Sequence, residues 1–258
     1  MDLSTSIENA DARGPAEPGR RKRWGPWATL AWSVPLGLVM IISQTVGVIA
    51  YWQWLRYAHP AQPVEILDLR TNGGALGFSL TLSAPFVLGF LAYLVYLSRV
   101  PIAEYLALKL PHWREVRLGF AALAAVLVIT GVLASVSGQE TPAFMTETFI
   151  SARAAGMLPL LMLAFVVLGP LQEEMLFRGF LFRGLAPALG VWPSVALTAL
   201  AWALLHAQYQ WFFVGEIFAL GLALGWLRAR SGSTVLTFGL HATVNGLALL
   251  EMAFLSPS

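Results

Sequence analysis

Long apolar runs that carry few charges recur along this chain, and they limit its possible folds more than any other feature. A helix needs about 20 apolar residues to cross the hydrocarbon core of a bilayer. Only helices and closed barrels satisfy all their backbone polar groups there. The 258 residues are 57% hydrophobic and 12% charged, far from the balance of a soluble domain. The sequence therefore predicts an integral membrane protein of the all-α class, a polytopic helical bundle.

The apolar runs predict about seven transmembrane helices, with a range of about six to eight. The fifth and sixth come from one apolar block that the polar residues Gln208-Tyr209-Gln210 divide. The expected spans are 27–55, 78–98, 118–137, 154–177, 191–207, 211–227 and 233–254.

The first 23 residues differ in composition from the rest of the chain. They are polar, rich in Pro and Gly, and end in a run of four basic residues at 20–23, so they are too poor in apolar side chains to fold alone. We expect residues 1–23 to form a disordered basic cytosolic tail. Residues 24–258 are expected to form an integral membrane helical domain, with a catalytic core at 154–254. The apolar run that begins at Trp24 is too long for the apolar part of a cleaved signal peptide, so we expect it to stay as an anchor.

The basic residues are distributed unevenly between the two sides of the expected spans. With a cytoplasmic N-terminus, three of the 16 Lys and Arg residues lie on the outer side, namely Arg56, Arg70 and Arg153. The other thirteen lie on the inner side, which agrees with the positive-inside rule. We therefore expect a multi-pass protein whose N-terminus is cytoplasmic.

An acidic pair, Glu173-Glu174, stands inside the fourth apolar run. Glu174 and Arg178 are four residues apart, so on a helix the carboxylate and the guanidinium share a face and can pair. Glu173 points about 100° away on an ideal helix, toward a possible cavity. Gly169-Pro170 precedes the pair, and a kink there would open room for water beside Glu173. Alternatively, the three charged residues form a solvated cluster at a helix end near the cytosol.

Two histidines and an amide follow on later apolar runs. His206 comes four residues after Trp202, and His241 comes four residues before Asn245, so each pair shares a helix face. A lone membrane histidine is more often a hydrogen-bond partner between helices than a catalyst. Ionisable groups within spans nevertheless indicate functional sites. A glutamate and a histidine can deprotonate water, while an imidazole and an amide stabilise an oxyanion. The set predicts a polar intramembrane cavity equipped for peptide hydrolysis.

The residues do not decide whether the protein uses a metal cofactor. There is no cysteine, so thiolate metal sites and a cysteine nucleophile are excluded. Imidazole and carboxylate are ordinary zinc ligands, but the chain has no His-Glu-x-x-His pair that would put two ligands on one helix face. A divalent metal such as zinc is possible, and the proposed chemistry does not require one.

Four other polar residues have weaker claims to a role in chemistry. His59 and His112 lie in expected loops, where a surface role is the simpler interpretation. Glu216 and Glu251 lie in the last two spans, and we expect Glu216 to be a structural or rim residue. The segment 101–117 reads either as a short helix lying on the inner membrane surface or as a connecting loop.

Taken in order, these motifs resemble those of the CPBP intramembrane protease family. They are E-E-x-x-x-R at Glu173, Glu174 and Arg178, an aromatic-x-x-x-H ending at His206, and H-x-x-x-N ending at Asn245. The family groups type II CAAX prenyl endopeptidases with bacterial relatives, among them Abi-like proteins linked to bacteriocin processing and self-immunity. Its second motif usually begins with Phe, where this chain has Trp202.

The resemblance implies roles for the candidate residues. Glu173 and His206 would activate water, His241 and Asn245 would form the oxyanion site, and Glu174 and Arg178 would support the first acid. The family is often called a metalloprotease, although a glutamate-dependent mechanism without a catalytic metal is also argued for it. The resemblance further implies a bacterial inner-membrane protein.

The leading hypothesis is an intramembrane endopeptidase. Its partners would be the lipid bilayer and a membrane-tethered peptide or protein substrate, with no nucleic acid. The alternatives are a non-enzymatic immunity or scaffold protein of the same fold and, third, a transporter or proton pathway. The expected span boundaries contain one conflict. They place Glu173 much closer to the cytosolic face than His206, although both residues are assigned to one site.

Overall fold

The computed structural model describes residues 24–61 and 64–255, and these residues form helices without any strand. The predicted tail, residues 1–23, lies outside the described residues. The elements are α2 (Pro26–Ala58), η1 (Ile66–Thr71), α3 (Gly73–Leu97), α4 (Ile102–Tyr105), α5 (Trp113–Val136), α6 (Ala143–Ala154), α7 (Leu158–Met162), η2 (Leu163–Leu168), α8 (Gly169–Glu174), η3 (Met175–Leu181), α9 (Phe182–Leu189), α10 (Val191–Leu204), α11 (Trp211–Ser231) and α12 (Thr234–Leu255).

Six helical segments of the described chain are long and apolar enough to cross a membrane, so the protein is a multi-pass membrane protein. Five of them are α2, α3, α5, α11 and α12, and the sixth is the continuous segment Leu158–Leu189, which joins α7 to α9. The fifth predicted span is the 14-residue α10. At 1.5 Å per residue it extends about 21 Å, which is less than the hydrocarbon core. The predicted polytopic bundle is confirmed.

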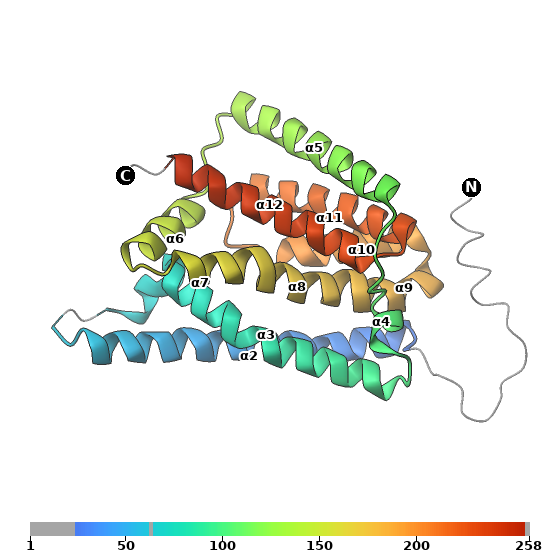
Figure 1. Ribbon diagram of the computed structural model, residues 1–258, viewed down its shortest axis with the longest axis horizontal. Helices are drawn as coiled ribbons and strands as arrows, with labels where there is room; N and C mark the ends of the chain where they lie inside the picture. Colours follow the sequence, from blue (N-terminus) through green and yellow to red (C-terminus); the bar gives the residue numbers. More distant parts are fainter. Residues whose placement is uncertain (1–23, 62–63, 256–258) are drawn as a thin grey trace, which may run out of the picture.

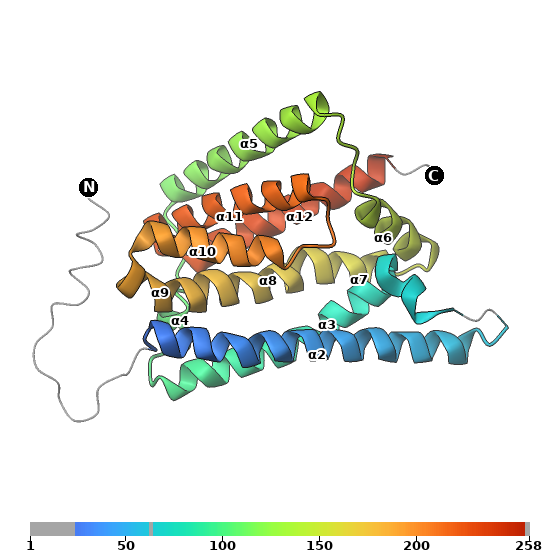
Figure 2. The same ribbon diagram turned by 180° about the vertical axis from the view of Figure 1, so that it is seen from behind.

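The bundle has two sides and a central helix. Helices α2 and α3 pack against each other along one side, and α5 lies on the opposite side (Figures 1 and 2). Leu158–Leu189 runs between them and packs against α3 and α12, while α10 and α11 form a helical hairpin. The centre is filled by side chains such as Leu91, Phe180, Leu224 and Leu240, all at most 1% exposed.

The fourth span reaches further than the sequence predicted. It was expected to end at residue 177, because Arg178 and Arg183 read as loop charges. Arg178 is instead buried beside Glu174, and Arg183 donates a hydrogen bond to the carbonyl of Glu104, so neither charge ends the helix.

This longer helix removes the conflict in depth between the two main site residues. Glu173 lies sixteen residues before the helix end at Leu189. His206 lies fifteen residues after Val191, the first residue of α10. The two side chains therefore reach a similar depth in the bundle.

The segment between α3 and α5 packs into the end of the bundle. The hydroxyl of Thr234, at the start of α12, donates to the carbonyl of Leu106 at 2.6 Å, and its backbone N–H donates to that of Ala107. The structure combines the two interpretations of this segment, a short helix at Ile102–Tyr105 and a connecting stretch up to α5. The apolar residues Tyr105 and Leu106 are buried in the end of the bundle, where they also bury the turn between α11 and α12.

The distribution of basic residues needs a small revision. Arg178 and Arg228 were counted as inner charges, but both are buried in membrane helices and are not loop residues. Eleven inner residues then stand against three outer ones, so the expected orientation is unchanged.

Single cysteines test this orientation, because the chain contains none. His112 and Glu140 are both exposed and lie at opposite ends of α5. In intact cells, a membrane-impermeant maleimide should label Glu140→Cys and should reach His112→Cys only after the membrane is permeabilised. The reverse pattern would show that the orientation is inverted.

Candidate functional site

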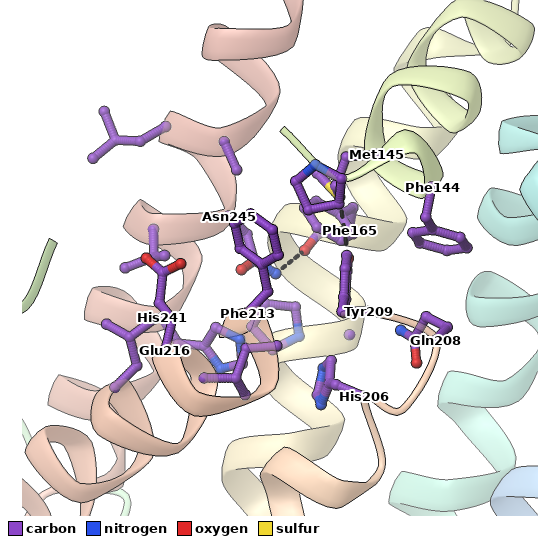
Figure 3. A pocket seen from close by; sticks show the side chains of 18 of the residues that line it. Phe144, Met145, Phe165, His206, Gln208, Tyr209, Phe213, Glu216, His241 and Asn245 are labelled. Atoms are coloured by element: carbon purple, nitrogen blue, oxygen red, sulfur yellow. Dashed lines mark hydrogen bonds between the residues drawn. The ribbon is translucent and has the colours of Figure 1, made fainter. Parts of the chain in front are cut away.

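A cavity of about 760 Å³ lies within the bundle, and the candidate residues meet at it (Figure 3). Its walls come from α2, α3, α5, α6, the segment Leu158–Leu189, α10, α11, α12 and the 205–210 turn. The site residues that line it are Glu173, Trp202, His206, His241 and Asn245. Three separate motifs of the sequence therefore converge on one cavity, where they place polar groups among mostly apolar lining residues.

Glu174 and Arg178 form the predicted ion pair behind the cavity wall. A guanidinium nitrogen of Arg178 lies 2.7 Å from Oε1 of Glu174, and the two side chains are 1% and 0% exposed. The alternative of a solvated cluster at a helix end is therefore wrong. The guanidinium also donates to the carbonyl of Gly221 and lies 4.6 Å from the ring centroid of Trp202. A Cβ at Gly221 would sit 2.9 Å from Ala199, so glycine is what lets this carbonyl approach.

His241 is oriented by the same carboxylate. Its Nδ1 lies 3.1 Å from Oε1 of Glu174, and its Nε2 lies 3.9 Å from Oε2 of Glu173. A carboxylate held by Arg178 accepts hydrogen bonds, so Nδ1 carries the proton and donates it. The Nε2 atom is thereby directed toward the cavity.

Glu173 stands in a different environment from its neighbour in sequence. Its side chain is 24% exposed, and its Oε2 accepts a hydrogen bond of 2.5 Å from the indole N–H of Trp202. Its Oε1 has no hydrogen-bond partner within the described part of the chain. The departure from Phe at position 202 thus has a structural consequence, because only Trp carries this donor.

His206 is held by the same tryptophan. Its Nδ1 lies 2.9 Å from the carbonyl oxygen of Trp202, and a carbonyl can only accept, so Nδ1 is the protonated nitrogen. A neutral His206 then has an unprotonated Nε2 that can accept a proton. Trp202 therefore positions both the glutamate and the histidine that were predicted to activate water.

Asn245 caps an irregular stretch of the central helix. In η2 the N–H of Gly169 bonds to the carbonyl of Ala164, five residues back. In that register the carbonyl of Phe165 would need the N–H of Pro170, which proline lacks. The amide of Asn245 donates to this carbonyl at 2.8 Å (Figure 3). An amide has two N–H groups, so one donor remains.

Two further residues near the site, Gln172 and Tyr209, had no distinctive signal in the sequence. Gln172 is buried and accepts a hydrogen bond from the hydroxyl of Ser83 on α3, which ties the helix of the acidic pair to its neighbour. Tyr209, in the turn after α10, donates to the sulfur of Met145 at 3.1 Å. Burial and then the charge of Glu173 raise the pKa of Tyr209, so its phenol stays protonated. Only the tertiary structure brings these groups together.

The remaining polar candidates divide into two groups. His59 and His112 are exposed, as predicted. Glu216 and Glu251 both line the cavity, so the expectation that Glu216 is a structural or rim residue does not describe its position fully.

The described donor set does not fit a three-ligand metal site. Across residues 24–61 and 64–255, no three His, Asp or Glu side chains form a group that could hold a metal ion. Nδ1 of His241 is engaged with Glu174, and Oε2 of Glu174 is buried without a hydrogen-bond partner behind the cavity wall. The chemistry below is therefore derived without a step through a metal.

Comparison with known proteins adds independent evidence. Residues 155–247 match the family described as type II CAAX prenyl endopeptidase Rce1-like. A protein of Escherichia coli described as an uncharacterized 24.3 kDa protein is 30% identical over 166 residues, which cover 62% of this chain and 73% of that protein. The chain belongs to the Rce1-like family. No solved structure matches it. The Rce1-like match spans all the motif residues from Glu173 to Asn245, and it agrees with the fold of an intramembrane protease.

A double-mutant cycle tests the buried ion pair. Removing one member of such a pair leaves the other charge uncompensated, so Glu174→Ala and Arg178→Ala should each destabilise the protein by roughly 3–5 kcal/mol. The double variant should lose much less than the sum of the two. Thermal unfolding in detergent measures all three variants, and strictly additive losses would show that the two residues do not interact.

Proposed function

We propose that this protein is an intramembrane endopeptidase that hydrolyses a peptide bond of a membrane-associated protein or peptide. The observation that carries the proposal is the pair of free acceptor atoms, Glu173 Oε1 and His206 Nε2, which Trp202 positions on one cavity. A membrane cavity with two such bases beside two hydrogen-bond donors suits hydrolysis. The Rce1-like match supports the same reaction class.

In the first step, Glu173 and His206 act on one water molecule. Glu173 takes a proton as the water oxygen bonds to the carbonyl carbon of the substrate, and His206 orients the water through its Nε2. The carbonyl oxygen becomes an oxyanion. Glu173 suits this role because its carboxylate is partly exposed and its Oε2 is fixed by Trp202.

The oxyanion is stabilised by His241 and Asn245. Asn245 offers its second N–H, since the first is used by Phe165. His241 already donates from Nδ1, so it can donate from Nε2 only as an imidazolium. The positive charge of this imidazolium is compensated by its neighbours, because Glu173, Glu174 and Arg178 together carry one net negative charge. Donors placed before the reaction begins give the largest single contribution to such catalysis.

In the second step the C–N bond breaks, and the leaving amine takes the proton held by Glu173. The products are a carboxylic acid and an amine, so the carboxylate is regenerated and no external reactant besides water is consumed. Glu174 and Arg178 take no part in proton transfer. They hold His241 in the required orientation.

We further propose that the catalytic core is 154–254 and that the protein resides in the inner membrane of a bacterial cell with a cytoplasmic N-terminus. The similarity to an Escherichia coli protein and the basic residues on one side support this placement. A membrane-tethered peptide reaches such a cavity directly from the bilayer. The immunity or scaffold function and the transporter function gain no support from the family match.

Substitution of the two bases tests the assignment. Glu173→Gln and His206→Ala should each lower the rate of cleavage by about 100-fold to 10,000-fold, since each removes a proton acceptor. Purified protein in proteoliposomes is incubated with a mixture of membrane peptides, and the products are identified by mass spectrometry.

Glu251→Gln is the matched control, because Glu251 also lines the cavity but contacts none of the four proposed catalytic side chains. It should insert normally and cleave at the wild-type rate. Cleavage at the wild-type rate by Glu173→Gln would refute the mechanism.

A further inference from the structure

Glu216 is a carboxylate of the cavity that the proposed reaction does not use. It lies on α11, five residues after Trp211. It is half-buried and lines the same cavity as Glu173. Figure 3 shows it together with His241 and Asn245. A carboxylate within a membrane span is costly and commonly marks a functional contact.

Within the described residues, Glu216 has one hydrogen bond and no counter-charge. Its Oε1 accepts from the hydroxyl of Thr130 on α5 at 2.9 Å. That hydroxyl has a single proton, and its oxygen also lies 3.0 Å from the carbonyl oxygen of Val126, so the proton is shared between two acceptors. No described Lys, Arg or His forms an ion pair with Glu216, and its Oε2 has no hydrogen-bond partner among residues 24–61 and 64–255.

The second oxygen of this carboxylate is open to the cavity, because Oε2 is not among the described buried side-chain atoms that lack a partner. A carboxylate within a membrane protein is usually paired with a charge or with several donors, and here the protein supplies one shared hydroxyl. The protein therefore leaves the carboxylate to be compensated by a group that enters the cavity.

The charges that line the cavity are mostly carboxylates, and the imidazolium proposed for His241 lies against the carboxylates of Glu173 and Glu174. The lining includes the carboxylates of Glu173, Glu216 and Glu251, and none of the described lining residues is Lys or Arg. A cavity with low-dielectric walls and predominantly one sign of charge concentrates ligands of the opposite sign. Beside Glu216, the apolar side chains of Leu127, Ile217 and Leu220 also line the cavity and can pack against the methylene groups of a long side chain.

We propose that Glu216 is a specificity-determining residue that binds the ammonium or guanidinium group of a Lys or Arg side chain in the membrane-tethered substrate. Thr130 holds Oε1, which leaves Oε2 for the cation. The substrate is then anchored at α11 while the bond to be cut lies at Glu173. This inference rests on the proposed function, because it takes the bound peptide to be a substrate. Its test measures binding and does not depend on cleavage.

The test measures binding in a Glu173→Gln background, reconstituted in nanodiscs, where cleavage does not interfere. The probes are two short, fluorescently labelled apolar peptides, blocked at both ends, that differ only in one central residue, lysine or the uncharged norleucine. The lysine peptide should bind at least about tenfold more tightly, as one charge-assisted contact predicts. Adding Glu216→Gln should bring the two affinities within about twofold. Adding Glu140→Gln, which changes an exposed carboxylate outside the cavity lining, should preserve the preference.

A second variant guards against misfolding of Glu216→Gln. Thr130→Ala combined with Glu216→Ala removes both partners of the hydrogen bond and leaves no unsatisfied hydroxyl, and it should also abolish the preference. Equal binding of the two peptides by the Glu173→Gln protein, or a preference that survives both Glu216 variants, would overturn the proposal. Charge-selective binding without cleavage by the Glu173-intact protein would refute the protease and support the role of Glu216. Cleavage without charge-selective binding would support the protease and refute the proposed role of Glu216.

Discussion

The buried ion pair between Glu174 and Arg178 holds the site together. Arg178 contacts the carboxylate, the ring of Trp202 on α10 and the carbonyl of Gly221 on α11. Glu174 in turn accepts from His241 on α12. Four helical segments are thus joined through two side chains that are almost completely buried. Burying two charges is costly, and the cost is offset because Oε1 of Glu174 pairs with Arg178 and His241, while the guanidinium contacts Glu174, Trp202 and Gly221. Oε2 of Glu174 and Nε of Arg178 are buried without a hydrogen-bond partner among the described residues.

The pair also explains how two adjacent glutamates acquire different roles. Glu174 is enclosed, neutralised by a guanidinium and committed to holding an imidazole. Glu173 is partly exposed, with one oxygen held by Trp202 and the other directed to the cavity. Environments that divide two neighbouring carboxylates in this way are a recurring means of assigning acid and base roles. In this protein the division follows from the helix itself, because consecutive residues point about 100° apart.

The sequence predicted the parts of the site that follow from spacing along one helix. The pairing of Glu174 with Arg178 depends only on helical periodicity. Trp202 and His206 are in contact as expected, although α10 ends at Leu204 and His206 lies in the turn that follows it. The end of the central span was misjudged, because burial of Arg178 requires neighbours that no local pattern reveals. The same holds for Tyr105 and Leu106, whose partners lie on α9, η3 and α12, and for the carbonyl of Phe165, which Asn245 reaches across the bundle. Contacts between distant segments are what the sequence alone did not predict.

Comparison of protein N-termini is the most direct test of the central claim that this cavity hydrolyses peptide bonds within the membrane. Membranes are taken from cells that produce either the wild type or Glu173→Gln at equal levels, and the N-termini of all membrane proteins are compared by mass spectrometry. The account predicts a small set of internal N-termini, within or beside apolar segments of other membrane proteins, that occur with the wild type and are absent with Glu173→Gln. Identical sets of N-termini in the two membranes would contradict it.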